Sequence, residues 1–271
     1  MKKLLVFYNF IEASDRALAQ AISLGKKDGA KIIICHILEK KTGEAEILKK
    51  LEPLAEKVRL SGLEVDVELE YGTIFEAAAN AAKRIKPDLV IAGTRGAEGF
   101  DMSIFGSAIY KFVRDVAYTS LVLHSDSKIA EGGYKKIMLP VSPHTNFIKK
   151  VKEVLKVLSD NGEVTVFALV KEGAELDEVT QRNIEITEKY LDEQGVKWEY
   201  KEFATKKNQQ NLATQTLNKV MELETDLITI SADVSSQNMH FGKMHKEDML
   251  LNGQSIPVLC VGTDPDHRNS G

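Results

Sequence analysis

The chain has 271 residues and a formal net charge of −4, and 43% of its residues are hydrophobic against 28% charged. This length suits two domains of ordinary size, each able to bury its own core. The slightly acidic balance argues against a general nucleic-acid-binding protein, and no apolar run is long enough for a membrane-spanning helix.

The cysteines and the N-terminus both favour a cytoplasmic protein. Cys35 and Cys260 each lie within an apolar strand pattern, which favours reduced core thiols over a disulfide or a zinc site. Residues 1–3 lead directly into a first strand that is too short and wrongly flanked for a signal peptide. We therefore expect a cytoplasmic location and no binding to nucleic acid or membrane.

The first half of the chain alternates strand-like and helix-like segments. Apolar runs typical of buried parallel strands cover residues 3–9, 31–38, 88–92 and 118–123, and the alternating residues 63–70 fit an edge strand. Helical spacing covers residues 14–25, 42–61 and 73–85, and a fourth helix opens at residue 106. This alternation predicts a five-stranded parallel sheet with right-handed crossovers.

The second half repeats this pattern after a polar linker at Gly132-Gly133. Its strand-like runs cover residues 136–141, 163–170, 197–203, 226–231 and 257–261, and its helical segments cover 147–158, 178–194 and 208–223. Three pairs of matching segments begin at offsets of 138, 136 and 137 residues: Asp88 with Asp226, Phe105 with Phe241, and Ser120 with Pro257. Such regular spacing predicts a tandem duplication, with domains at residues 1–127 and 134–265.

The loop after the fourth strand carries the clearest functional pattern. Gly93 and Gly96 are separated by two residues, Gly106 follows after nine more, and Ser107 comes next. A strand that feeds a glycine loop ending at a helix N-terminus offers backbone N–H groups and a helix dipole to a phosphate. The alternative is an ordinary connection whose glycines serve only turns. The matching segment, residues 231–243, lacks most of these glycines within the same framework, which favours a nucleotide site.

Together these features resemble the universal stress protein family. The family's nucleotide-binding signature has this glycine and serine spacing. The segment LLVFYNFIEASDRAL is similar to its first strand and helix, and SIPVLCV is similar to its last strand. The resemblance covers almost the whole chain. It implies an α/β fold of two tandem five-stranded parallel sheets with helices on both faces, Rossmann-like, with strand order 3-2-1-4-5. Ligands of such sheets bind at the switch point between strands 1 and 4.

The resemblance also implies ATP, with or without Mg²⁺, as the cofactor of the N-terminal domain. Gly93 and Gly96 would let the backbone approach ribose and phosphates, and the segment 106–108 would donate helix-start N–H groups. Glu98 and Asp101 are candidate Mg²⁺ ligands, although solvated loop carboxylates are the commoner case. The implied cofactor-binding residues are Phe7, Tyr8, Asn9, Ile37, Gly93, Thr94, Arg95, Gly96, Gly106, Ser107 and Ala108.

Both halves depart from the family pattern. Asn9 places an amide where an acid usually follows the first strand, which removes a charge-assisted contact without excluding binding. The second half has the segment 231–234, Ser-Ala-Asp-Val, in place of the first glycines, and Lys243 in place of the serine. Side-chain crowding and repulsion from Asp233 lead us to expect no ATP binding there. His240 and His245 could hold a metal, but a surface loop without a ligand is the simpler interpretation.

These observations predict a tandem stress-response or signalling module that is gated by ATP. We expect an unidentified protein partner to recognise this module. We also expect the two strand-5 edges to pair within the chain, and chains to associate further as homodimers. One alternative is a slow ATPase or phosphoryl-transfer enzyme. The sequence shows no general base, catalytic carboxylate pair or Walker lysine near the loop, so we assign no catalytic residue. Another alternative is a scaffold that binds no ATP.

Overall fold

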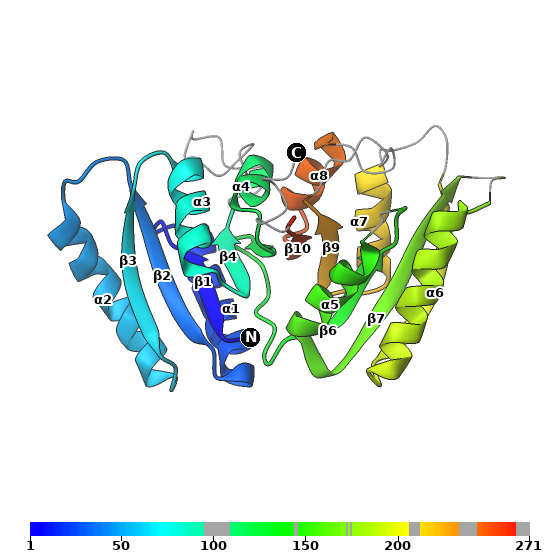
Figure 1. Ribbon diagram of the computed structural model, residues 1–271, viewed down its shortest axis with the longest axis horizontal. Helices are drawn as coiled ribbons and strands as arrows, with labels where there is room; N and C mark the ends of the chain where they lie inside the picture. The colour runs from blue at the N-terminus through cyan, green and yellow to red at the C-terminus, as the bar shows by residue number, and fades with distance from the viewer. Residues whose placement is uncertain are drawn as a thin grey trace.

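The computed structural model describes residues 1–94, 109–143, 146–171, 173, 175–205, 212–232 and 243–263. The described strands form one ten-stranded sheet in the order β3-β2-β1-β4-β5-β10-β9-β6-β7-β8 (Figure 1). Each half therefore has the strand order 3-2-1-4-5. The predicted α/β fold of two Rossmann-like halves is confirmed.

The N-terminal half contains the first five strands, which all pair in parallel. Its elements are β1 (Lys3–Phe7), α1 (Glu12–Asp28), β2 (Lys31–Leu38), α2 (Glu44–Leu60), β3 (Val65–Tyr71), α3 (Ile74–Ile85), β4 (Leu89–Gly93), α4 (Ile109–Val116) and β5 (Ser120–Leu123). The boundaries agree with the sequence pattern to within a few residues. Alternating strand and helix thus places the carboxyl ends of all five strands at one edge of this half.

The C-terminal half repeats this arrangement. Its elements are β6 (Tyr134–Pro140), α5 (Phe147–Val157), β7 (Leu158–Lys171), α6 (Glu178–Glu193), β8 (Lys197–Thr205), α7 (Leu212–Glu222), β9 (Leu227–Ser231), α8 (Lys243–Leu250) and β10 (Val258–Val261). Strand β7 begins earlier than predicted because Leu158 already pairs with Tyr134, ahead of a register shift. The polar residues 159–162 hide this extension from a hydrophobicity pattern.

The duplication is visible in the backbone itself. Lys86 and Glu224, which are 138 residues apart, both adopt the left-handed conformation with φ of 51°. Ala117 and Ser255, at the same offset, have φ values of 64° and 56°. Non-glycine residues seldom adopt this conformation, so its recurrence at matched positions is strong support for an internal repeat.

A pair of aspartates fixes the same strand junction in both halves. Asp88 accepts hydrogen bonds from the backbone N–H groups of Lys2 and Lys3, at 2.6 and 2.9 Å. Asp226 does the same for Lys135 and Lys136, at 2.8 and 3.2 Å. Each carboxylate thus ties the start of its fourth strand to the start of the first, which sets the register at the centre of each sheet.

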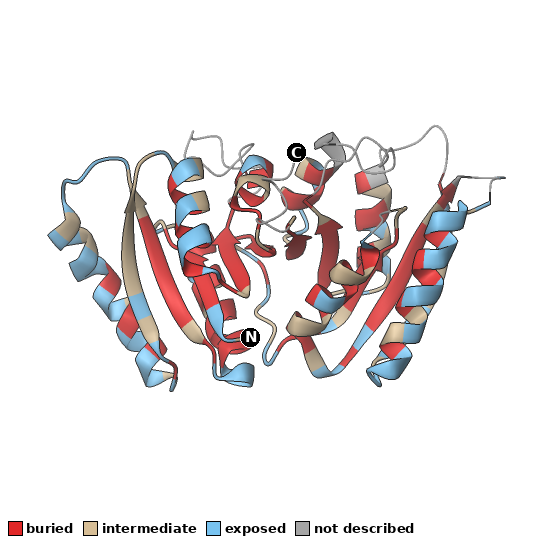
Figure 2. Cartoon of the chain, in the orientation of Figure 1, coloured by how far each residue is buried: buried red, intermediate tan, exposed pale blue. Residues whose placement is uncertain are grey.

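Two hydrophobic layers cover the faces of the sheet. Helices α1, α2, α5 and α6 pack on one face against residues such as Leu4 and Leu139, and α3, α4, α7 and α8 pack on the other against Leu5 and Met138. Figure 2 shows buried residues along the strands and exposed residues on the outer helix surfaces. Among the described helices, none combines the length and apolar character needed to cross a membrane.

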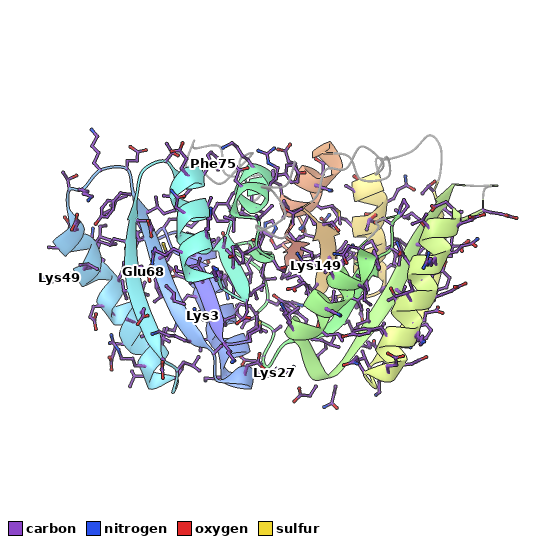
Figure 3. The ribbon with its side chains drawn as sticks, in the orientation of Figure 1. Lys3, Lys27, Lys49, Glu68, Phe75 and Lys149 are labelled. Carbon is purple, nitrogen blue, oxygen red and sulfur yellow. The ribbon has the colours of Figure 1, made fainter. Side chains whose placement is uncertain are left out.

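The two halves join through an antiparallel pair of short strands. Val258 of β10 lies opposite Val122 of β5, and Cys260 lies opposite Ser120. This confirms the predicted pairing of the strand-5 edges within the chain. At the opposite end of the junction, Lys27 (Figure 3) donates a 2.5 Å hydrogen bond to the Leu158 carbonyl. The pairing of β5 with β10 thus covers the open aliphatic edge of each half with a strand of the other half.

A buried histidine lies beside this junction. His124 is 3% exposed, and its Nε2 lies 3.4 Å from Nδ2 of Asn252 in the other half. Its backbone N–H donates to Ser127, whose hydroxyl donates in turn to the Ser255 carbonyl at 2.8 Å. Burial lowers the pKa of His124 from 6.5 to about 4, opposed by the charge of Asp126.

His124 should make the protein sensitive to acid. Between about pH 6.5 and pH 4 the unfolded chain binds a proton that the folded chain does not, so stability falls as pH falls through this window. The full effect corresponds to roughly 3 kcal/mol. Urea unfolding of His124→Asn at pH 7 and pH 4.5 should show a smaller loss than the wild type shows. Equal losses in the two proteins would exclude His124 as the cause.

Candidate functional site

The carboxyl ends of β1 and β4 form the topological switch point of the N-terminal half. After β1 the chain adds β2 and β3 on one side of this strand, and it then adds β4 and β5 on the other side. This is where open parallel sheets bind ligands. Of the predicted site residues, the structure brings together Phe7, Tyr8, Asn9, Ile37, Gly93 and Thr94 at these strand ends. The remaining ones, Arg95, Gly96, Gly106, Ser107 and Ala108, lie outside the described residues, as do Glu98 and Asp101.

The turn after β1 is braced by the first turn of α1. The Tyr8 hydroxyl donates to Asp15, and the Tyr8 backbone N–H donates to the Cys35 carbonyl at 2.9 Å. Burial, together with the hydrogen bond to Asp15, raises the pKa of Tyr8. The amide oxygen of Asn9 accepts from the Ser14 hydroxyl. Asn9 therefore already uses its acceptor within the protein, which leaves its amide N–H group for a ligand.

Strand β2 extends beyond the end of β1. The last paired residues are Phe7 and Cys35, whereas β2 continues to Leu38 alongside β3. The Cys35 carbonyl faces β1, and backbone groups two residues apart in a strand face the same neighbour. Ile37 therefore directs its N–H and C=O toward the space beyond the end of β1.

An aromatic side chain also lies at this rim. Phe10 has a φ of 60° and is 41% exposed, with its ring centroid 5.3 Å from that of Tyr8 and 5.1 Å from that of His36. The Nδ1 atom of His36 lies 2.7 Å from the Tyr8 carbonyl oxygen. A phenylalanine with a left-handed backbone conformation is unusual, and no sequence pattern predicts it.

Gly93 has a structural role that its motif did not reveal. A Cβ atom at this position would lie 2.3 Å from the carbonyl carbon of Ala13 and 2.7 Å from the backbone nitrogen of Ser14. The glycine therefore lets the start of α1 approach the end of β4. The next residue, Thr94, is fully buried, and its N–H donates to the Leu123 carbonyl at 2.8 Å.

The described residues show no cluster of three or more His, Cys, Asp or Glu side chains that could hold a metal ion. Asp15 is a carboxylate beside the switch point, and it already accepts from Tyr8. The histidines considered as a metal pair, His240 and His245, have no described side chains.

Comparison with known proteins agrees with this architecture. The model of the universal stress protein family matches residues 1–124. A universal stress protein from Archaeoglobus fulgidus DSM 4304 is 16% identical over 97% of each chain, with a TM-score of 0.71. A functionally unknown protein from Pseudomonas aeruginosa PAO1 is 14% identical, with a TM-score of 0.65, over 97% of this chain and 93% of that one. No curated protein matches the chain in sequence.

A universal stress protein in complex with cAMP is also similar, at 19% identity. It covers 46% of this chain and 98% of its own length, with a TM-score of 0.39. The family match covers the half that carries the glycine motif, and the similarity in fold extends over both halves. Residues 1–124 therefore match the universal stress protein family in sequence, and the C-terminal half repeats the fold of this half.

Proposed function

We propose that the N-terminal half binds ATP at the carboxyl ends of β1, β2 and β4. The observation that carries this proposal is the backbone of Ile37, which extends past the end of β1. Its N–H and C=O match the acceptor and donor on the Watson–Crick edge of adenine. The ribose and phosphates then extend from this edge over β1 toward β4 and the glycine motif of residues 93–107.

ATP bound in this way contacts residues of the glycine motif and changes the surface formed around them. A protein partner recognises this surface, so the chain acts as a nucleotide-gated module in stress adaptation or signalling. The buried free thiols of Cys35 and Cys260 fit the reducing cytoplasm. Because β5 and β10 already pair within the chain, a homodimer would use another surface, such as the outer strands β3 and β8.

Nucleotide titration of the full chain tests this proposal. We expect one ATP per chain by calorimetry, and the same stoichiometry of nucleotide released when the purified protein is denatured. Gly106→Trp should weaken binding about tenfold or more by filling the phosphate site. Gly242→Trp, at the corresponding position of the second half, is the matched control and should leave the affinity unchanged.

The alternatives predict different outcomes. Sustained phosphate release that Gly106→Trp abolishes would support a slow ATPase or phosphoryl-transfer enzyme in place of a switch. Absence of ATP binding by the wild type would support a scaffold. Loss of binding in Gly242→Trp with retention in Gly106→Trp would show that the nucleotide binds in the C-terminal half. This outcome would contradict the proposal.

A further inference from the structure

The outer strand of the C-terminal half has one unpaired side. Strand β8 runs in continuous parallel register with β7, from Lys197 opposite Glu163 to Thr205 opposite Lys171. It ends the strand order of the sheet, so its other side faces no strand of the described chain. Backbone N–H and C=O groups on this side can pair with a further strand. The segment KWEYKEFAT contains no proline that would oppose such pairing.

Helix α6 carries carboxylates along this edge (Figure 1). Asp192 accepts a 2.7 Å hydrogen bond from Nε1 of Trp198 in β8, which places this side of the helix beside the strand. Glu185 and Glu188 precede Asp192 by seven and four residues, and this spacing puts all three on one side of a helix. Burial, followed by the negative charges of Asp192 and Glu185, raises the pKa of Glu188, which agrees with this placement.

The strand adds a fourth carboxylate on the same face of the sheet. Trp198 and Tyr200 pack against the core beneath α6, and Glu202 follows two residues later on this face. The Tyr200 hydroxyl donates to Glu202 at 3.0 Å. A strand added beside β8 would direct every second side chain toward these groups. The four carboxylates, which we call the acidic edge, are Glu185, Glu188, Asp192 and Glu202.

The acidic edge has no cation of its own. None of its four carboxylates forms an ion pair within the part of the chain that the structure describes. Lys189 of α6 lies 4.0 Å from Glu193, and Lys201 of β8 lies 2.8 Å from Glu199. Lys197 and Lys201 also lie on the opposite face of β8, because side chains alternate along a strand. The negative charge of this edge is therefore available to a partner.

The outer strand of the N-terminal half is different, because its carboxylates are paired. In β3, Asp66 lies 2.7 Å from Nζ of Lys31. Glu68 (Figure 3) lies 2.5 Å from Arg84, which also pairs with Glu70. Each acidic side chain of this strand thus has a cation partner within the chain.

The neighbouring helix of the N-terminal half is paired in the same way. Helices α2 and α6 match at an offset of 133 residues, which brings the buried positions 51 and 58 onto the buried positions 184 and 191. At this offset Arg59 corresponds to Asp192. Arg59 pairs with Glu52 at 2.8 Å and with Glu56 at 3.0 Å. Unpaired carboxylates beside an open strand are therefore specific to the C-terminal half and are not a requirement of the fold.

We propose that β8 binds an extended segment of a partner protein that carries lysine or arginine at every second position. The segment adds a strand to the sheet through backbone hydrogen bonds, and its basic side chains meet the acidic edge. A second copy of this chain fits less well, because it would bring the same carboxylates against each other. This surface is separate from the nucleotide site of the N-terminal half, so the inference does not rest on ATP binding.

Binding of synthetic peptides to the full chain tests the proposal. The capped peptide TKVKTKVKT has lysine at every second position, and calorimetry at low salt should detect one such peptide per chain. The acidic peptide TEVETEVET should bind at least tenfold more weakly. The peptide TKVKPKVKT keeps every charge but lacks a central backbone N–H donor, and it should bind at least fivefold more weakly.

Variants of the chain locate the binding site. The double variant Glu185→Gln with Glu188→Gln should weaken binding of TKVKTKVKT at least fivefold. The matched control is Glu52→Gln with Glu56→Gln, which removes the same charge from the outer helix of the other half and should keep the affinity within about twofold. Circular dichroism establishes that both variants are folded. Hydrogen exchange of the wild type should show that the peptide protects amides of β8 and leaves those of β3 unchanged.

Several outcomes would overturn the proposal. Absence of binding by the wild type would do so, as would equal affinity for the acidic or the proline-containing peptide. Equal weakening by the two double variants would show that only the overall charge matters. Protection gained at a site other than β8 would place the peptide elsewhere. A wild-type dimer that protects the amides of β8 without any peptide would show that a second copy occupies this edge.

Discussion

Gly93→Ala is expected to lower the free energy of unfolding by roughly 3 kcal/mol or more. The new Cβ atom would lie 2.3 Å from the carbonyl carbon of Ala13 and 2.4 Å from its oxygen. Both are backbone atoms, so relief requires α1 to move away from β4 and to disturb the packing of its buried face. Urea unfolding without nucleotide measures this loss separately from any effect on ATP binding.

The second half supplies the matched control for this substitution. Ser231 ends β9 as Gly93 ends β4, and it already carries a Cβ atom. Ser231→Ala should therefore change the stability by less than about 1 kcal/mol. If Gly93→Ala were as mild as Ser231→Ala, the close approach of α1 would not explain the glycine, and a role in ligand binding alone would become the better account.

The sequence predicts the fold well because the same pattern of strands and helices occurs twice. The aspartates at 88 and 226 stand at the same place in two matching strand patterns, and each forms the same pair of backbone hydrogen bonds. Hydrophobic strands alternating with amphipathic helices leave few other topologies. The exposed aliphatic edges of the fifth strands also predict their pairing, since burial is the favourable outcome for such edges.

The site is less predictable because it depends on how closely separate elements approach each other. The spacing of Gly93 within its motif favours a phosphate loop, yet its contact with α1 requires the relative positions of a helix and a strand. The same holds for Lys150, which looks like one of many helix-surface lysines in the sequence and is buried in the structure. The backbone of Phe10 is a third case, because its left-handed conformation contradicts the preference of its residue type.

Gly262→Ala should weaken the junction between the two halves and lower the free energy of unfolding by roughly 3 kcal/mol. Gly262 follows β10, and a Cβ atom there would lie 2.3 Å from the carbonyl oxygen of Ala117 and 2.4 Å from the carbonyl carbon of Tyr118. These atoms precede β5, so the clash separates the strands that join the halves. If each half can then unfold by itself, thermal unfolding should split into two transitions.

Hydrogen exchange locates the effect of Gly262→Ala in the structure. Protection of backbone amides should fall in β5 and β10, and it should be retained in the inner strands β1 and β6. Gly253→Ala is the control, because a Cβ atom on Gly253 meets nothing within 4 Å and should change stability by less than about 0.5 kcal/mol. A single transition at the wild-type temperature would show that the backbone at 262 can shift without cost. The close contact at Gly262 would then not be what holds β5 and β10 together.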